Sequence, residues 1–523
     1  MRQPRELWKS RIGLVLATAG NAIGLGNFLR FPVQCAQNGG GAFMVPYLIA
    51  LLLLGLPLMW CEWAMGRHGG HRGHGTTPGI FYHLWHHRIS KYLGTFGILI
   101  SFGVGVYYLY VMSWTLAYSF FSLTGRYMGI TSQEEMHLFL SSFQGVTTSR
   151  YFNSIDVSYI FYLICLGLCI YILSKGVVKG LERLAKYGMP LLFIFGIILV
   201  IRIFTLGTPD PTMPQNSINA GMGFMWNPDF ASLKNPKVWL AAAGQVFFTL
   251  SVGFGAIQTY ASYIKKQDDV ALNGLSTAAT NSFAEIILGG SIAIPIAVAF
   301  FGIVGTRVVA EGGAFNLGFM AMPLIFQKIP LGQVFGTVWF FLLFVAGLTS
   351  AVAIVQPFMA FLQDEFQVSR KLATAITGAT LFVLGQPVIF FLKHGFLDEM
   401  DFWLGTFGVT LFAVIEVVVF VWLFGPKKAW AEITAGADIK VPRLFYFILK
   451  YVTPTFLVIL LGTWLYQSGM DTILLKGISG ENLPYVIGVR VMLLLMLLGL
   501  VAGVKYSFAH HRLEKRGIKR ETK

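Results

Sequence analysis

Long apolar segments follow one another along almost the whole chain and are separated by short polar or glycine-rich loops. A transmembrane helix needs about 20 mostly apolar residues in succession. We therefore predict an all-α integral membrane protein that forms one transmembrane domain over residues 1–523. Its twelve expected helices lie at approximately residues 12–37, 42–66, 91–124, 157–173, 184–203, 238–262, 270–301, 333–363, 371–390, 402–424, 445–467 and 484–505.

Glycine and small polar residues interrupt two of these helices near the middle of the membrane. The interruptions are Gly20–Asn27 in the first helix and Phe248–Gly255 in the sixth. Each glycine weakens a helix by about 1 kcal/mol relative to alanine, and irregular backbone at membrane depth is tolerated only where it lines protein or a water-filled cavity. Close packing through small residues is the alternative, but it does not explain the Asn, Thr and Ser among the glycines. We expect both helices to be broken there.

The two interruptions occupy corresponding places in two groups of five helices. The first group covers residues 1–203 and the second covers residues 238–424, followed by two additional helices at 445–505 and a basic tail at 506–523. A pair of glycine-interrupted helices at corresponding positions of two halves indicates the binding site of a secondary transporter.

The composition excludes an ordinary soluble protein, because 55% of the residues are hydrophobic and only 12% are charged. Soluble domains have about 25% charged residues. The net charge of +15 would suit a nucleic-acid-binding protein, but the Lys and Arg residues concentrate in alternate loops and in the C-terminal tail. This is the bias of cytoplasmic loops in membrane proteins. We infer that both termini are cytoplasmic, that the protein contacts a lipid bilayer, and that it has no nucleic-acid partner.

The sequence lacks the motifs of an enzyme or a metalloprotein. It has no intramembrane Ser-His-Asp set, no His-Glu-x-x-His motif and no lysine-containing phosphate loop, so we predict that it is not an enzyme. No Asn-x-Ser/Thr glycosylation site occurs, which favours a bacterial cytoplasmic (inner) membrane. Histidines crowd the first cytoplasmic loop, where we favour a solvated loop over a metal site: His68, His71, His74, His83, His86 and His87.

Several stretches of the sequence together resemble the neurotransmitter:sodium symporter family. They are Asn21–Pro32, Asn38–Phe43, Phe247–Ser251, Ala346–Ser350 and Asp398–Trp403. The resemblance extends from about Arg5 to Pro454 and fades in the loops near 125–156 and 204–220. It implies an inverted repeat of five plus five helices, with the first and sixth helices broken. It also implies sodium-coupled import of small to medium neutral amino acids, such as leucine or alanine, by alternating access.

By this resemblance, the broken helices hold the substrate. Backbone N–H groups of Leu25 and Gly26 and the Tyr108 hydroxyl would bind its carboxylate, and carbonyl groups at the half-helix ends would bind its ammonium group. Gly24 leaves room for that carboxylate, where relatives that transport amines have Asp. The expected substrate-binding residues are Asn21, Ala22, Gly24, Leu25, Gly26, Val104, Tyr108, Phe248, Thr249, Ser251, Phe254, Ser350 and Ile354.

The resemblance also implies two sodium ions and no organic cofactor. Sodium is a hard cation that prefers oxygen ligands. The first site would consist of Ala22, Asn27, Thr249 and Asn281 together with the substrate carboxylate, so that sodium and substrate would reinforce each other's binding. The second site would consist of Gly20, Ile23, Ala346, Thr349 and Ser350. A Thr-Ser pair in a helix usually bonds back to the preceding turn, so the second site depends on the resemblance alone.

Charged residues within transmembrane segments are rare and usually functional. The resemblance assigns Arg30 and Asp401 to an outer gate, and it places the Glu285 carboxylate where chloride-dependent relatives bind a chloride ion. We therefore expect chloride-independent transport. An inner gate would consist of Arg5 and Asp364, surrounded by Trp8, Tyr263 and Gln356. Glu62 and Glu416 also lie within spans, and we expect them to have structural roles.

Two other functions would use the same kind of pocket. An amino-acid sensor binds its ligand without transporting it, but it would often lose the Arg5–Asp364 pair or gain a signalling tail. A sodium-independent exchanger would not need the oxygen-bearing residues of the two expected sodium sites. The preferred amino acid, the stoichiometry and homodimer formation are left open by the sequence.

Overall fold

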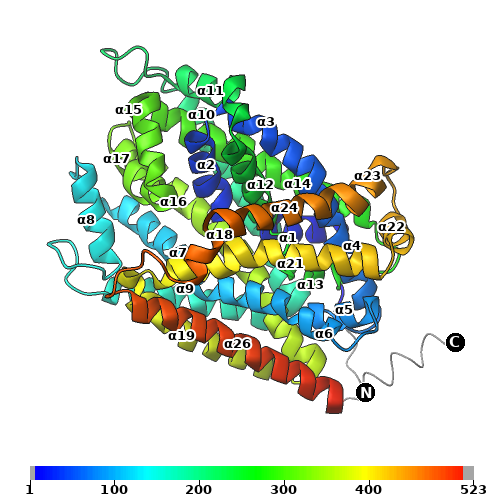
Figure 1. Cartoon of the computed structure of the whole chain (residues 1–523). Coiled ribbons are helices and arrows are strands. Elements are labelled where there is room, and N and C mark those ends of the chain that lie inside the picture. The colour runs from blue at the N-terminus through cyan, green and yellow to red at the C-terminus, as the bar shows by residue number, and fades with distance from the viewer. Residues whose placement is uncertain (1–5, 511–523) are drawn as a thin grey trace.

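The computed structural model describes residues 6–510, and the secondary structure within that part of the chain is helical throughout (Figure 1). Ten helical segments are long and apolar enough to cross a membrane. They are Gly41–Gly70, Ser90–Thr124, Asp156–Ser174, Val177–Phe204, Val270–Glu311, Gly332–Phe366, Arg370–Phe390, Phe396–Leu423, Leu444–Gln467 and Leu483–Ala509.

The two remaining predicted spans are the ones that contain a break. The first is bent by 50° between α1 (Arg11–Ala22) and the segment Gly26–Gln37. The sixth consists of α12 (Pro236–Leu250) and α13 (Ala256–Ala261), which are separated by the non-helical residues 251–255. The predicted all-α, twelve-helix architecture with broken first and sixth helices is therefore confirmed.

Several helices are longer than the apolar pattern predicts. The fifth span begins at Val177 and the tenth begins at Phe396, while the last helix, α26 (Leu483–His510), ends at His510. The seventh span is interrupted at Gly302, whose backbone is not helical, so its first part ends where the sequence predicts. The apolar pattern marks only the part of a helix inside the hydrocarbon, whereas the hydrogen-bonded helix continues into the polar boundary once it has formed. Most of the expected basic tail lies outside the described residues.

The centre of the bundle is formed by α7 (Thr95–Thr124) and α18 (Gly332–Phe366), which pack along each other and are buried over almost their whole length. In contrast, α26 lies at the edge of the bundle and exposes much of its apolar surface (Figure 1). The half-helices α1, α12 and α13 lie inside the bundle, since most of their residues are buried. The two breaks are therefore shielded from lipid.

Short helices close both ends of the bundle. Figure 1 shows α8 (Gln133–Phe143) and α17 (Met322–Gln327) at one end, and α5 (Thr77–Leu84), α6 (Ser90–Leu93) and α22 (Pro426–Thr434) at the other. The loops that the sequence assigns to one membrane side therefore lie at the same end of the molecule.

The break in the sixth helix depends on backbone conformations that favour glycine. Gly253 has a φ of 79°, and its N–H donates to the carboxylate of the fully buried Glu62 over 2.6 Å. A Cβ atom on Gly253 would lie 2.4 Å from the carbonyl oxygen of Val409. Because an unpaired N–H at membrane depth costs several kcal/mol, Glu62 has a structural role in holding the unwound segment.

We predict that Gly253→Ala lowers the thermal unfolding temperature of the detergent-solubilised protein by several degrees. The new methyl group would meet the Val409 carbonyl in a backbone region that alanine disfavours. The matched control is Gly244→Ala, because Gly244 lies within α12 with no atom near its missing Cβ. The control should keep or raise the unfolding temperature, since alanine is the better helix former. Equal stability of both variants would contradict this account of the break.

Candidate functional site

Residues from the two broken helices, α7 and α18 line one buried cavity. Its lining residues are Ala22, Gly24, Leu25, Gly26, Asn27, Val104, Tyr108, Phe248, Thr249, Ser251, Phe254, Ser350 and Ile354. The structure thus brings together all the predicted substrate-binding residues except Asn21, and it adds Asn27 from the predicted first sodium site. The Asn21 side chain is fully buried elsewhere, although its backbone carbonyl accepts a hydrogen bond from the Ser251 hydroxyl over 3.2 Å.

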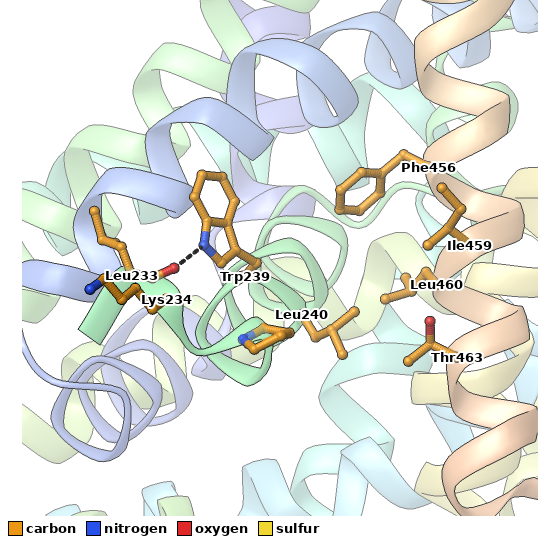
Figure 2. Close-up of a pocket in the computed structure, with 9 residues that line it drawn as sticks. Leu233, Lys234, Trp239, Leu240, Phe456, Ile459, Leu460 and Thr463 are labelled. Atoms are coloured by element: carbon orange, nitrogen blue, oxygen red, sulfur yellow. Dashed lines mark hydrogen bonds between the residues drawn. The ribbon is translucent and has the colours of Figure 1, made fainter. Parts of the chain in front are cut away.

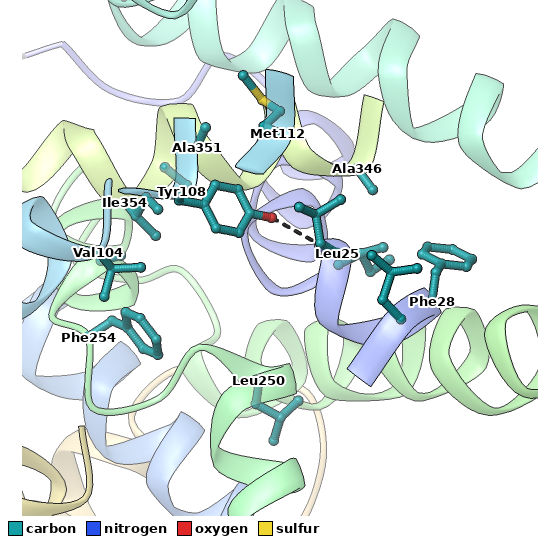
Figure 3. Close-up of a cluster of buried hydrophobic side chains, with 14 of the residues drawn as sticks. Leu25, Phe28, Val104, Tyr108, Met112, Leu250, Phe254, Ala346, Ala351 and Ile354 are labelled. Atoms are coloured by element: carbon teal, nitrogen blue, oxygen red, sulfur yellow. Dashed lines mark hydrogen bonds between the residues drawn. The ribbon is translucent and has the colours of Figure 1, made fainter. Parts of the chain in front are cut away.

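One end of the cavity presents hydrogen-bond donors from the break in the first helix. The Leu25 N–H donates to the Tyr108 hydroxyl oxygen over 3.2 Å (Figure 3). The Gly24 N–H donates to the Asn27 side chain over 2.9 Å. The next helical segment begins at Gly26. N–H groups at the start of a helix carry a partial positive charge, so this end of the cavity suits an anionic group such as a carboxylate.

Another part of the cavity is formed where two half-helices end. α1 ends at Ala22 and α12 ends at Leu250, so the last carbonyl groups of both helices lie near each other and the cavity. Carbonyl groups at a helix C-terminus carry a partial negative charge. They suit a cation, either an ammonium group or a metal ion.

The remaining wall is apolar. Figure 3 shows Val104, Phe254 and Ile354 on one side of the Tyr108 ring, while Leu25 lies at its hydroxyl. Each of these side chains is buried in the described structure, and no charged residue lines the cavity. The cavity therefore has two polar parts of opposite sign and an apolar part, which is the chemical outline of a neutral amino acid.

The residues of the predicted first sodium site meet beside the cavity. The Asn27 amide donates to the Thr249 hydroxyl over 3.0 Å and to the Asn281 side chain over 2.8 Å. One terminal atom of the Asn281 amide lies 3.2 Å from the carbonyl oxygens of both Ala22 and Thr249. If that atom is oxygen, three oxygens face one another, and a hard cation would bind all three at once. The donor set fits sodium.

The residues of the predicted second sodium site also lie close together, but the contacts of Thr349 are those of an ordinary threonine in a helix. A Cβ atom on Gly20 would lie 3.2 Å from the Thr349 Cβ, so the first helix contacts α18 there. The Thr349 hydroxyl donates to the carbonyls of Val345 and Ala346 over 3.1 and 3.0 Å. This is the back-bonding that threonine commonly makes in helices. Ser350 lines the cavity, and Ile23 is fully buried next to the break.

The two charged residues of the predicted outer gate each contact an aromatic side chain. The Arg30 guanidinium lies 4.3 Å from the centre of the Phe248 ring, at the mouth of the cavity. Asp401 accepts a hydrogen bond from the Tyr107 hydroxyl over 2.5 Å, and no ion pair joins it to Arg30 among residues 6–510. The sequence did not reveal the contact of Tyr107 with Asp401, because nothing distinguishes Tyr107 in an aromatic-rich helix.

Four of the five predicted inner-gate residues lie within the described part of the chain, whereas Arg5 lies outside it. Trp8 donates from its indole to the Tyr260 carbonyl over 3.0 Å and from its backbone to the Tyr263 carbonyl over 3.2 Å. Gln356 donates to the Tyr263 hydroxyl over 3.0 Å. Asp364 accepts from the backbone N–H of Gly75 over 3.0 Å. These contacts join the N-terminal segment, the residues that follow α13, α18 and the loop that precedes α5 at one end of the bundle.

Glu285 lies one helical turn after Asn281 and is fully buried. The Tyr47 hydroxyl donates to one carboxyl oxygen, and the Gln245 amide donates to the other over 2.5 Å. Thr249 follows Gln245 by one turn of α12. The helix of Glu285 therefore also carries Asn281, and the helix of its partner Gln245 also carries Thr249, two residues of the predicted first sodium site. A carboxylate here is close enough to balance the charge of a cation at that site.

The histidine-rich loop is only partly solvated, so the sequence expectation is wrong for two of its members. His74 is buried and lies 2.9 Å from a Glu365 oxygen, and His68 is buried and lies 3.4 Å from a Glu432 oxygen. Burial, together with charge repulsion from the neighbouring His74, lowers the pKa of His83 to about 3. Within the described residues, no group of three or more His, Cys, Asp or Glu side chains is arranged to hold a metal ion.

The helical membrane bundle has two broken helices around a buried cavity, which offers N–H donors to an anion and carbonyl groups to a cation. This architecture defines a secondary transporter. The chain matches the model of the sodium:neurotransmitter symporter family over residues 5–138 and 153–505, and it belongs to that family. The family consists of sodium-dependent transporters, so the predictions of sodium-coupled membrane transport and of a non-enzymatic protein are confirmed.

Individual relatives support this assignment. An uncharacterized sodium-dependent transporter of Methanocaldococcus jannaschii is 32% identical over 493 residues, which are 92% of this chain and 94% of the relative. The human sodium-dependent neutral amino acid transporter SLC6A17 is 23% identical, over 90% of this chain and 74% of its own length. The crystal structure of MhsT in complex with L-phenylalanine superposes with a TM-score of 0.74 at 30% identity, covering 87% of this chain and 99% of MhsT.

We predict that Thr249→Val weakens sodium binding by at least about tenfold. The substitution keeps the shape of the side chain but removes a hydroxyl that bonds Asn27 and Asn281, and an interaction with a charged group is worth about 1.5–3 kcal/mol. The measurement is the sodium chloride concentration that gives half of the maximal thermal stabilisation, with choline chloride holding the ionic strength constant.

The matched control for this measurement is Thr277→Val. Thr277 is as deeply buried as Thr249, but its hydroxyl bonds the Thr18 hydroxyl over 2.9 Å, one helix turn or more from the cavity. This variant should lose some stability and keep the sodium midpoint. If both variants show the unchanged midpoint, Thr249 does not bind sodium.

Proposed function

We propose that the protein is a symporter that uses two sodium ions to import a small to medium neutral amino acid across a bacterial cytoplasmic membrane, with both termini in the cytoplasm and without a need for chloride. The observation that carries this proposal is the cavity, which has donors at one end, carbonyl groups at another and an apolar wall between them. Such a cavity matches the carboxylate, the ammonium group and the side chain of one ligand.

Gly24 is the position that favours an amino acid over an amine. A Cβ atom there would lie 2.9 Å from the Tyr108 hydroxyl and 3.3 Å from the Ser350 hydroxyl, so a larger residue would fill the donor end of the cavity. With glycine, the ligand must bring its own negative charge to the Leu25 and Tyr108 donors. A ligand without a carboxylate would leave these polar groups unpaired, at a cost of about 1–3 kcal/mol for each group.

The apolar wall favours an aliphatic side chain of medium size. Val104, Phe254 and Ile354 offer no hydrogen bond to a polar side chain. SLC6A17 is a neutral amino acid transporter, and MhsT was crystallised with L-phenylalanine, a neutral amino acid with a larger aromatic side chain. Both relatives support a neutral amino acid as the substrate, and the preference for a medium aliphatic side chain rests on the cavity wall. Apolar pockets separate ligands by only about 1–3 kcal/mol per methylene, so transport of several such amino acids is expected.

Coupling between sodium and substrate follows from shared residues. Ala22, Asn27 and Thr249 line the cavity and also belong to the proposed first sodium site. A substrate carboxylate at this position would be an additional oxygen ligand, so each species would increase the affinity of the other by the same factor. This sharing distinguishes a symporter from a sodium-independent exchanger.

We predict that the purified protein in proteoliposomes accumulates labelled leucine or alanine only when a sodium gradient is directed inward. Replacing external sodium by potassium should reduce uptake to the level of empty vesicles, because the substrate then lacks its sodium partner. Gramicidin, which dissipates the gradient, serves as a control and should abolish accumulation. Sodium-dependent binding without accumulation would instead identify a sensor, and accumulation in potassium would identify an exchanger.

The proposal of chloride independence rests on Glu285. Its carboxyl group is fully buried and accepts hydrogen bonds from Tyr47 and Gln245. Glu285 follows Asn281 by one helical turn, and Gln245 precedes Thr249 by one turn of α12. Burying a sodium ion in this low-dielectric region is costly unless a negative charge lies nearby. Glu285 would supply that charge as part of the protein, so no external anion is required.

We predict that Glu285→Ser makes sodium-driven uptake dependent on chloride. Serine removes the carboxylate and leaves space and a hydroxyl donor for an anion beside Tyr47 and Gln245. Glu285→Gln is the matched control, because it is also neutral but fills the space, and its uptake should be low with or without chloride. Wild-type uptake should be equal in chloride and gluconate. Robust uptake by the serine variant in gluconate, unchanged by added chloride, would contradict the role of Glu285 in balancing the charge of sodium.

A further inference from the structure

An apolar groove lies on the outside of the bundle, away from the central cavity. It has a volume of about 310 Å³ and separates the start of α12, with the preceding turn Phe230–Lys234, from α24 (Thr453–Trp464) (Figure 2). Its lining residues are Leu233, Lys234, Pro236, Trp239, Leu240, Phe456, Ile459, Leu460 and Thr463. This volume is at the lower end of the range of small-molecule sites, which is about 300–1,000 Å³.

The α24 side of the groove faces the surroundings of the bundle. α24 belongs to the apolar span Leu444–Gln467, and Val458 and Ile459 are each 58% exposed on it. Such an apolar surface within a membrane-spanning segment contacts lipid chains. The Trp239 indole is fixed in the opposite wall by its hydrogen bond to the Leu233 carbonyl, over 2.9 Å (Figure 2).

The mouth of the groove is basic. Lys234 lines the groove, Lys237 begins the next helical turn, and both are exposed and form no ion pair within residues 6–510. The nearby Asp229 carboxylate is bonded within its own turn, to the Ala231 N–H and the Ser232 hydroxyl, each over 3.0 Å. A lysine at the end of a membrane span extends its charged group into the headgroup region.

We propose that this groove binds one anionic phospholipid of the bilayer. An acyl chain would lie between Trp239 and Leu240 on one side and Ile459 and Leu460 on the other, and the headgroup phosphate would lie near Lys234 and Lys237. The apolar walls select a hydrocarbon chain, and the two unpaired ammonium groups select a negative headgroup over a zwitterionic one. Each lysine near a lipid surface contributes about a fivefold preference.

Tryptophan fluorescence in vesicles of phosphatidylcholine tests this proposal directly. A fixed small fraction of lipid with brominated acyl chains, either phosphatidylglycerol or phosphatidylcholine, quenches tryptophans that it contacts. The contribution of Trp239 is the difference between the wild-type protein and Trp239→Phe, because the other tryptophans are common to both. We expect brominated phosphatidylglycerol to quench this contribution with at least about fivefold higher apparent affinity than brominated phosphatidylcholine.

The headgroup assignment is tested in the double variant Lys234→Gln/Lys237→Gln, made with and without Trp239→Phe. Both lysines are exposed, so the fold should be retained, and the two brominated lipids should then quench Trp239 equally. Lys328→Gln is the matched control, because Lys328 is an exposed lysine that does not line the groove, and it should keep the preference.

Two results would overturn the proposal. Absence of Trp239 quenching by either lipid would mean that the groove holds no acyl chain and is closed by protein or another molecule. Equal quenching by both lipids in the wild-type protein would mean that the lysines do not select an anionic headgroup. Neither readout depends on uptake, so failure here is separate from failure of the proposed transport function.

Discussion

The need to satisfy backbone polar groups at membrane depth is the constraint on which the rest of this structure depends. An intact helix pairs its own N–H and C=O groups, whereas a break exposes several of each. In this protein the two breaks are enclosed by α7 and α18, and individual groups are paired, such as the Gly253 N–H with Glu62 and the Gly24 N–H with Asn27. The groups that remain face one cavity. The same irregularity that would destabilise an exposed helix therefore supplies the donors and acceptors of the binding site.

The apolar pattern was sufficient to predict the number and order of the helices, because a span of about 20 apolar residues has few other structures available in a membrane. The breaks were also predictable, since glycines next to Asn, Thr and Ser are poorly suited to a continuous helix. Several helix ends were not, and Val177 and Phe396 lie beyond the apolar segments that predicted their helices. Hydropathy reports where hydrocarbon surrounds a helix, and it carries no information about where the hydrogen bonding stops.

The residues of the site could be predicted mainly from the family resemblance and less from the pattern of residue types. Their side-chain contacts became known only from the structure. Position in a motif placed Asn21 in the cavity, but the buried Asn21 side chain does not line it, and the Asn21 backbone carbonyl accepts a hydrogen bond from Ser251. The resemblance assigned Arg30 and Asp401 to an outer gate, but it did not predict that Arg30 lies over Phe248 and that Asp401 accepts a hydrogen bond from Tyr107. Side-chain direction and the choice among several hydrogen-bond partners depend on packing between distant helices, which local sequence does not contain.

The half-helix α12 connects features that are otherwise separate. It carries Trp239 at the lateral groove, Gln245 against Glu285, and Phe248 and Thr249 at the cavity. Ten residues of helix span about 15 Å, so these groups occupy different depths but belong to one continuous, hydrogen-bonded rod that ends at Leu250. Because a helix shifts as a unit far more readily than it stretches, a tilt of α12 would move the ring beneath Arg30, the hydroxyl between Asn27 and Asn281, and the wall of the groove together. The break after Leu250 removes the helical hydrogen bonds that would couple α12 rigidly to α13, so such a tilt need not move α13 by the same amount.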